Sequence, residues 1–391
     1  MKALVIGTGA AGNKAVINLV EKGVVSKDDI MLINSTLKDI PKEYFESSIL
    51  LSTDYDGCGK QRHTAKKITL EALANGTLDI ISRMKQEYEK IIIATSLEGG
   101  TGSGSSIILA DYCVTELAMN VEIYTFTGFK EDIRGLANTV DFFKDLENNK
   151  YTVQVIRNDI FLKEKAKSMI EAQKMANDEF ALRVKISLGQ LIIPSENNID
   201  DTDLYKVATT VGYSTVEYIE VEDKIKSKEE FNNLIKEMLD SSKSLHIENP
   251  RPYRLAIITN LQENSQNYID CSEDSELVER FGDPYESFKH IQYTKDMDEF
   301  IAIIASGMKM PKDEVESIYK DYKKRSDSID KTADDFFEAM DKIKGNKEDA
   351  MFNMSIERRK RFVKDDSSKV KAAGNNSKFF NKYKINEESD Y

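Results

Sequence analysis

The chain has 391 residues, of which 40% are hydrophobic and 31% are charged, and its formal net charge is -13. This length predicts two packed domains, because single hydrophobic cores stop growing at roughly 250 to 300 residues. The composition excludes a wholly disordered protein, and no apolar run approaches the roughly 18 residues that span a bilayer. The acidic charge argues against nucleic-acid binding by the body of the protein, since phosphate attracts a basic surface.

The cysteines and the N-terminus predict a cytoplasmic protein. Cys58, Cys113 and Cys271 are far apart and lack CxxC spacing, so neither a zinc site nor a disulfide framework is expected. The apolar run after Met1 is too short for a signal peptide and leads directly into a glycine-containing loop. We therefore expect a reducing compartment and no membrane partner.

Strand-like apolar runs alternate with helical patterns through the first half of the chain. The runs are residues 3–6, 30–33, 49–51, 91–94, 121–126 and 153–156. This alternation predicts an α/β fold, in which helices cover both faces of a Rossmann-like parallel sheet and the ligand binds at the carboxyl ends of the strands. We assign this ligand-binding domain to residues 1–165.

The rest of the chain predicts four further segments. Dispersed apolar residues over 166–194 predict a long central helix, and the patterns over 195–308 predict a smaller α+β domain. Apolar residues at steps of three, four or seven predict an amphipathic helix over 309–345, which we expect to pack on the body rather than on a partner. The Lys, Asn and Ser content of 346–391 predicts a flexible tail. That tail is basic, because Ser355–Lys384 carries a net charge of +7. Since the whole chain carries -13, the other residues together carry -20.

A glycine-containing loop follows the first strand and opens a helix. Its residues are Gly7, Thr8, Gly9, Ala10, Ala11 and Gly12, followed by Asn13. Small residues let backbone amides approach a phosphate, and the amino terminus of a helix favours its negative charge. A dinucleotide-dependent oxidoreductase fits the same GxGxxG spacing but would carry an acidic residue at the end of the second strand. The residue there is Asn34, which weakens that alternative.

A second glycine-rich loop joins an apolar strand to an apolar helix and is more informative. It consists of Gly99, Gly100, Thr101, Gly102, Ser103 and Gly104. Four glycines with interleaved hydroxyl groups at such a junction provide donors that suit di- or triphosphate oxygens. It is not a Walker loop, because no lysine follows in the GxxxxGK[ST] spacing. A merely flexible turn explains poorly why six such residues stand between two apolar elements.

The run GGTGSG resembles the signature of the tubulin and FtsZ superfamily of GTPases, and matches to this family cover roughly residues 1–305. The resemblance implies GTP and GDP as ligands, together with Mg²⁺, and makes the segment from Gly7 to Asn13 the first phosphate loop. It also implies a third loop that senses the γ-phosphate, formed by Gly57, Cys58, Gly59 and Lys60. No residue is assigned as a metal ligand.

The resemblance further implies which residues contact the nucleoside. Thr127, in the loop Thr125–Gly128, would lie next to the ribose, and Asn158 would hydrogen-bond the guanine edge. Asp178 on the long helix would accept a hydrogen bond from the ring amino group. Asn34 is counted among the same nucleotide contacts. Phe180 either flanks the base or packs in the core, the commoner place for an aromatic residue on such a helix.

The acidic segment after the long helix resembles the catalytic loop of the family. Asn198, Asp200 and Asp203 fit its NxDxxD pattern, and Asp201 is an additional carboxylate. In the family these residues reach the nucleotide of the next subunit of a filament. There Asp200 and Asp203 would orient and polarise water against the γ-phosphate while Mg²⁺ neutralises developing charge. Local composition alone would predict a solvated acidic turn.

Within the superfamily, the chain most resembles the TubZ type, which segregates plasmid or phage DNA. FtsZ usually ends in an apolar peptide with an Asp-x-Pro-x-Phe pattern, whereas Arg358–Phe362 and Lys378–Lys384 here alternate basic and aromatic residues. This composition suits contact with a DNA-bound adaptor of the TubR type, although a solubilising tail would look similar. We therefore expect a filament that binds DNA indirectly. The alternatives are an FtsZ-like division protein, a phage spindle tubulin, which would carry an acidic tail, and, more distantly, the oxidoreductase.

Overall fold

The structure is a computed structural model that describes residues 1–80, 88–129, 132–146, 150–196, 198–343 and 378–384. The chain divides into two compact units, Met1–Tyr319 and Lys320–Tyr391. The first unit holds the sheet and every residue proposed as a site, so it is described first.

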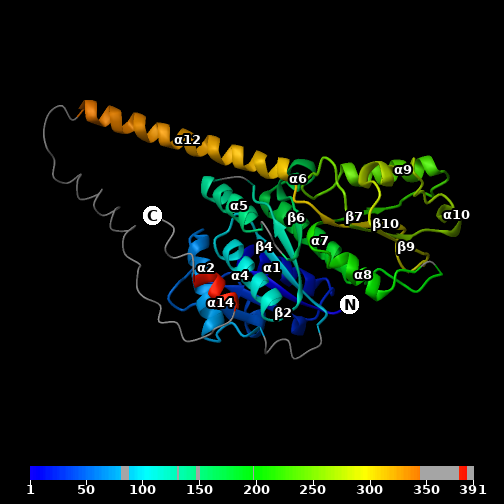
Figure 1. Cartoon of the computed structure of the whole chain (residues 1–391), viewed down its shortest axis with the longest axis horizontal. Coiled ribbons are helices and arrows are strands. Elements are labelled where there is room, and N and C mark those ends of the chain that lie inside the picture. The colour runs from blue at the N-terminus through cyan, green and yellow to red at the C-terminus, as the bar shows by residue number, and fades with distance from the viewer. Residues whose placement is uncertain (81–87, 130–131, 147–149, 197, 344–377, 385–391) are drawn as a thin grey trace. The chain divides into compact units, whose positions relative to one another are not determined.

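A single ten-stranded sheet runs through the first unit in the order β3-β2-β1-β4-β5-β6-β7-β10-β8-β9 (Figure 1). The strands β1 to β7 pair in parallel, β10 is antiparallel to both of its neighbours, and β9 is parallel to β8. Their bounds are β1 Ala3–Thr8, β2 Ile30–Asn34, β3 Ser48–Leu50, β4 Lys90–Ser96, β5 Asn120–Phe126, β6 Thr152–Ile156, β7 Gly212–Glu220, β8 Arg254–Asn260, β9 Glu286–Gln292 and β10 Phe300–Met308. The α/β class with a parallel Rossmann-like half is therefore confirmed.

Helices cover both faces of the parallel half. α1 lies with α7 on one face, while α2, α4 and α5 pack side by side on the other. The bounds in this unit are α1 Gly9–Glu21, α2 Arg62–Ala74, α4 Thr101–Thr115, α5 Ile133–Asp145, α6 Asn158–Glu164, α7 Met169–Ser187, α8 Asp201–Ala208, α9 Lys228–Asp240, α10 Glu263–Gln266 and α11 Glu276–Phe281, with short 3-10 turns at Lys27–Asp29 and Lys42–Ser47.

Capping residues in the sequence account for both ends of the long helix α7. The Ser168 hydroxyl accepts a hydrogen bond from the amide of Glu171, and the Glu171 carboxylate accepts one from the amide of Lys167, which satisfies donors at the helix start. Gly189, with φ of 75°, follows the last turn and lets the chain leave the helix.

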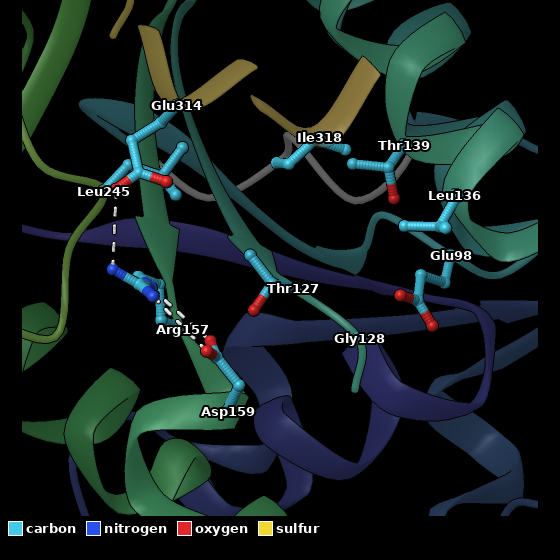
Figure 2. A pocket seen from close by; sticks show the side chains of 10 residues that line it. All are labelled: Glu98, Thr127, Gly128, Leu136, Thr139, Arg157, Asp159, Leu245, Glu314 and Ile318. Atoms are coloured by element: carbon cyan, nitrogen blue, oxygen red, sulfur yellow. Dashed lines mark hydrogen bonds and ion pairs between the residues drawn. The ribbon is translucent and has the colours of Figure 1, made fainter. Parts of the chain in front are cut away.

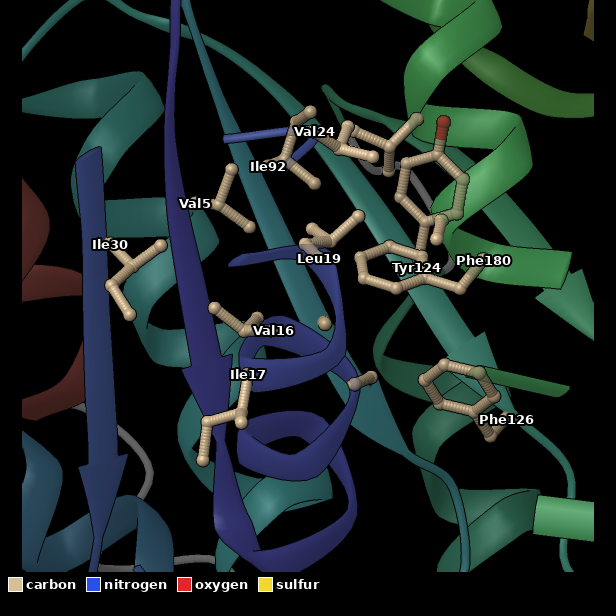
Figure 3. Packing of buried hydrophobic residues seen from close by; sticks show 14 of the residues in the cluster. Val5, Val16, Ile17, Leu19, Val24, Ile30, Ile92, Tyr124, Phe126 and Phe180 are labelled. Atoms are coloured by element: carbon tan, nitrogen blue, oxygen red, sulfur yellow. The ribbon is translucent and has the colours of Figure 1, made fainter. Parts of the chain in front are cut away.

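The face between α1, α7 and the sheet is a packed apolar core (Figure 3). Phe180 of α7 lies in it with edge-to-face ring contacts to Tyr124 and Phe126, at centroid distances of 5.1 and 5.8 Å. The core alternative for Phe180 is therefore confirmed, and no face of its ring is free to stack on a base.

The parallel and mixed halves are one continuous sheet. They join where β6 pairs with β7, at Thr152 opposite Gly212 and Val153 opposite Tyr213. The predicted segment boundaries at residues 165, 194 and 308 all fall inside the first compact unit. They remain predictions.

The helix α12 spans Lys312–Ile343, so it begins in the first unit and ends in the second. It agrees with the expected C-terminal helix. The second unit also contains α14, Lys378–Lys384, where Phe379 contacts the rings of Phe380 and Tyr383. The basic and aromatic stretch expected to be flexible is thus helical at this point. Arg358–Phe362 and the rest of the predicted tail lie outside the described residues. No helix in the described part of the chain is long and apolar enough to cross a membrane.

Candidate nucleotide-binding site

The first two glycine loops meet at the carboxyl edge of the sheet because β1 and β4 are neighbours. Gly9 has φ of 70°, and a methyl group there would lie 2.7 Å from the amide nitrogen of Gly102. A methyl group on Gly12 would lie 2.1 Å from the carbonyl oxygen of Ala94. Only glycine permits both approaches, so the amino ends of α1 and α4 lie side by side and face one ligand region.

The hydroxyl groups of these loops have different environments. Thr8 Oγ1 donates within the protein, to the carbonyl oxygens of Ala94 at 3.3 Å and Gly102 at 3.4 Å. Ser103 Oγ donates to the Gly99 carbonyl at 2.6 Å. The Thr101 hydroxyl instead lies 2.7 Å from that of Ser35 and is partly exposed. Thr101 is therefore the better placed of the three to meet a ligand.

The end of β2 and the third loop lie beside the second glycine loop. The Asn34 carbonyl Oδ1 accepts a hydrogen bond from the Ser35 amide at 2.9 Å, and the Ser35 carbonyl accepts one from the Gly57 amide at 3.1 Å. Cys58 is buried, and Lys60, with φ of 61°, pairs with Asp132 at the start of α5. The residues predicted for three separate loops are thus brought to one edge of the sheet.

Three amide side chains at this edge have buried atoms without a hydrogen-bond partner. They are Asn13 Oδ1, Asn34 Nδ2 and Asn158 Oδ1. Buried polar atoms are nearly always bonded, and each unmet one costs about 1–3 kcal/mol. All three were predicted nucleotide contacts, and a ligand that offers both donors and acceptors would satisfy them.

The predicted ribose and base contacts lie where β5 and β6 end. Thr127 Oγ1 accepts a hydrogen bond from the amide of Asn158 at 3.2 Å. A small pocket opens next to them, between α5, β6 and the first turns of α12 (Figure 2). Arg157 crosses it and pairs with Asp159 at 3.3 Å and with Glu314 at 3.7 Å.

The carboxylate of Asp159 is held in its charged form. Partial burial acts to raise its pKa, but hydrogen bonds from Lys163 and Arg157 outweigh this and hold the pKa below the ordinary value. Asp159 is therefore an anion next to Asn158, the predicted guanine contact. Arg157 is its counter-ion rather than a free cation for a phosphate.

Asp178 is not brought to the glycine loops. Its Oδ1 accepts a hydrogen bond from Asn18 Nδ2 at 3.2 Å and pairs with Lys22 at 3.0 Å. Both partners lie in or just after the later turns of α1, roughly 13 Å or more along the axis from Gly9. Its role as the acceptor for guanine stays a prediction.

The acidic loop, Asn198–Asp203, lies at the opposite edge of the sheet. The last residue of α7, Ser187, accepts a hydrogen bond from Lys90 Nζ at 2.7 Å, and Lys90 begins β4 whereas the second glycine loop follows its end. The 19 residues of α7 span about 28 Å between these edges. Within one subunit, the predicted catalytic residues and phosphate loops are therefore far apart.

Among the carboxylates of the acidic loop, Asp200 and Asp201 are exposed and Asp203 is half-buried. Asp200 caps α8, since its Oδ1 accepts a hydrogen bond from the amide of Asp203 at 2.8 Å. Asp203 pairs with Lys206 at 3.0 Å, and Asn198 is exposed.

Comparison with known proteins gives a match to one family over the first part of the chain. The sequence model described as "Tubulin/FtsZ family, GTPase domain" matches residues 2–164. Cell division protein FtsZ 1 of Pyrococcus horikoshii is 26% identical over 216 residues, which is 54% of this chain and 56% of that protein. The chain thus spans about half the length of the curated relatives it matches.

Solved structures share the fold over most of the chain. TubZ of Bacillus thuringiensis serovar israelensis, in a GTPγS-form protofilament, gives a TM-score of 0.68 at 16% identity and covers 87% of this chain and 94% of that chain. TubZ of Clostridium botulinum phage c-st, truncated at its C-terminal tail, gives 0.64 at 16% identity and covers 83% and 98%. Residues 2–164 thus match the GTPase domain of the tubulin/FtsZ family. The predicted resemblance to this family is confirmed, and the fold resembles that of TubZ.

Several residues that organise these loops were missed by sequence reasoning. Asn138 of α5 donates to the carbonyl oxygens of Lys60 at 2.9 Å and Glu98 at 3.0 Å, and so ties the third loop to the second. Arg62 is buried and donates to Ser103 Oγ at 3.0 Å. Only the basic run at Lys60–Arg62 gave any signal in the sequence, because the partners lie about 40 or 80 residues away.

Mg²⁺ was expected to accompany the nucleotide. The described residues contain no group of three or more His, Cys, Asp or Glu side chains that could hold a metal alone.

Proposed function

We propose that this protein is a cytoplasmic GTPase of the tubulin/FtsZ superfamily that assembles head to tail into filaments, hydrolyses GTP between subunits, and segregates a plasmid or phage DNA through an adaptor–centromere complex. The observation that carries the proposal is the separation of the acidic loop from the glycine loops, on opposite edges of one sheet. A subunit with both parts but at opposite ends can bring them together only through a second subunit.

The nucleotide site would hold GTP or GDP through its backbone amides and the unpaired amide side chains. The amino ends of α1 and α4 would bind the phosphates, with Thr101 donating its hydroxyl. Asn158 would bond the guanine edge through the Oδ1 atom that has no partner in the protein, and Thr127 would lie beside the ribose. Bound with the nucleotide, Mg²⁺ would neutralise charge that develops on the phosphate oxygens.

Hydrolysis would need the acidic loop of the next subunit. Asp200 and Asp203 would orient the attacking water and polarise it. Asn198 would hold the same water by a hydrogen bond. Asp203 forms an ion pair with Lys206 at the surface. When subunits meet, this ion pair would either break or bind the phosphate of the neighbouring subunit's nucleotide. Self-assembly is supported by the protofilament form of the similar TubZ structure.

The rate of GTP hydrolysis per subunit tests this proposal when it is measured across protein concentration. We expect negligible turnover below the assembly concentration and turnover proportional to sedimented polymer above it. Electron microscopy with GTP and with a slowly hydrolysed analogue would show filaments in both. Equal specific rates in dilute, unassembled protein would overturn interfacial hydrolysis.

The role in segregation is supported by the basic and aromatic composition of the tail and by the likeness to two TubZ structures. Deleting residues 354–391 should abolish capture of filaments by a DNA-bound adaptor of the TubR type while GTP turnover stays normal. A variant with Lys378, Lys382 and Lys384 changed to Gln would separate charge from the aromatic side chains. Unchanged capture after the deletion would refute contact through the tail.

A division role is the second candidate, because the curated relatives that match are FtsZ cell division proteins. The same capture experiment distinguishes the two candidates. A division protein would form GTP-dependent filaments but would not retain adaptor-bound DNA with or without residues 354–391.

A further inference from the structure

Two buried polar residues on the edge strand β9 contact the segment that leads into the acidic loop. His290 Nδ1 accepts a hydrogen bond from the amide of Ile199 at 3.3 Å, and His290 Nε2 lies 2.6 Å from Gln292 Oε1. Gln292 Oε1 also accepts from the amide of Ile193 at 2.7 Å, and its Nε2 donates to the carbonyl of Leu191 at 2.8 Å. The imidazole and the amide thus hold this segment at three backbone positions.

The bonding partners permit only one assignment of protons. The amide of Ile193 can only donate, so the atom it contacts must be the oxygen of Gln292. That oxygen requires the proton of His290 on Nε2, which leaves Nδ1 unprotonated to accept from the amide of Ile199. Burial lowers the pKa of His290, which favours this neutral form.

The anchored amide belongs to the residue between the two catalytic candidates. Ile199 stands between Asn198 and Asp200, and its side chain is buried in the core with Leu191 and Leu204. Asp200 follows as the cap of α8, so the orientation of the peptide at Ile199 sets where both flanking polar side chains point. Both side chains are exposed, and Asp200 is also held by the hydrogen bond that it accepts from the amide of Asp203.

We propose that His290 and Gln292 are positioning residues, which fix the acidic loop in the geometry needed to act on the nucleotide of the neighbouring subunit. The inference rests on the proposed function of that loop. His290 touches neither substrate nor the reacting atoms and acts through the amide of Ile199.

A matched pair of substitutions separates this role from mere packing. His290→Asn places an acceptor near the position of Nδ1, whereas His290→Gln places its polar group near Nε2 and offers nothing to Ile199. Lys289→Ala, at an exposed neighbour on β9, is the control. Thermal unfolding, GTP binding, sedimentation and phosphate release would be measured for each.

We expect GTP binding and sedimentation to stay near wild type in all three variants. Turnover should fall roughly 10- to 100-fold in His290→Gln, because a misplacement of about 1 Å costs this much, and should be retained in His290→Asn and Lys289→Ala. Equal turnover in the two His290 variants would overturn the proposal. If His290→Gln does not fold, Gln292→Glu replaces it. This variant keeps both acceptor contacts of Gln292 but loses the donor to Leu191, and its turnover must fall by the same factor.

Combining each variant with Asp200→Asn distinguishes failure of this inference from failure of the proposed function. If His290 acts through the loop, His290→Gln adds little loss of turnover in the Asp200→Asn background. A full additional loss there would show a global effect and refute positioning. Wild-type turnover in Asp200→Asn alone would refute the catalytic role of the loop and the inference with it, whereas loss there with normal turnover in His290→Gln would refute only the inference.

Discussion

Asp200 has two separable tasks in this structure, as the cap of α8 and as an exposed carboxylate. Asn caps a helix about as well as Asp does, whereas Ala costs about 0.5–2 kcal/mol. We therefore expect Asp200→Ala to lower the melting temperature by roughly 2 °C and Asp200→Asn to leave it unchanged. Both remove the carboxylate, so turnover should fall about 10²- to 10⁴-fold in each while GTP binding and filaments persist.

The assay is phosphate release at saturating GTP, well above the assembly concentration, with sedimentation to show equal polymer. Asp201→Asn is the matched control, because Asp201 is an equally exposed neighbour in the first turn of α8. We expect it to keep near wild-type turnover. Normal turnover in Asp200→Asn, or an equal loss in Asp201→Asn, would refute the assignment of catalysis to the Asp200 carboxylate.

Three further substitutions test the site and the fold. Gly12→Ala should weaken GTP binding and lower the free energy of unfolding by about 1–3 kcal/mol, because its methyl group would meet the Ala94 carbonyl, while Lys14→Ala on the same helix turn should do neither. Asn158→Leu should weaken GTP binding roughly tenfold in titration calorimetry yet keep or raise the stability of nucleotide-free protein, since Oδ1 has no partner there. Hydrogen bonds, first from Ser272, lower the pKa of Asp270 to about 2, so it stabilises the fold above pH ~4 and loses this effect toward pH 2. Asp270→Asn should therefore reduce stability to urea at neutral pH, and its difference from wild type should vanish near pH 2.

The local elements of this chain could be predicted because their causes are local in the sequence. A strand, a run of small residues and a helix are contiguous at Gly7–Gly12 and again at Gly99–Gly104, so both loops were found from composition and spacing. The helix α7 was found for the same reason, whereas the acidic segment was singled out by its resemblance to the family's catalytic loop.

The fastening of those loops could not be predicted. Asn138 lies 78 residues from the Lys60 carbonyl that it bonds, and Arg62 lies 41 residues from Ser103. Apart from the basic residues at Lys60 and Arg62, nothing near them in the chain marks them, because their partners are backbone atoms and hydroxyl groups supplied by other elements. Likewise, the place of Phe180 depended on which strands α7 covers.

By itself the sequence determined the order of strands and helices, the two phosphate-type loops and the acidic segment, because hydrophobic period and glycine spacing act over a few residues. Only the tertiary structure decided that three loops share one edge, that the acidic loop lies at the other, and that His290 anchors it. Those relations follow from strand order and helix length, which bring together or separate residues regardless of their distance along the chain.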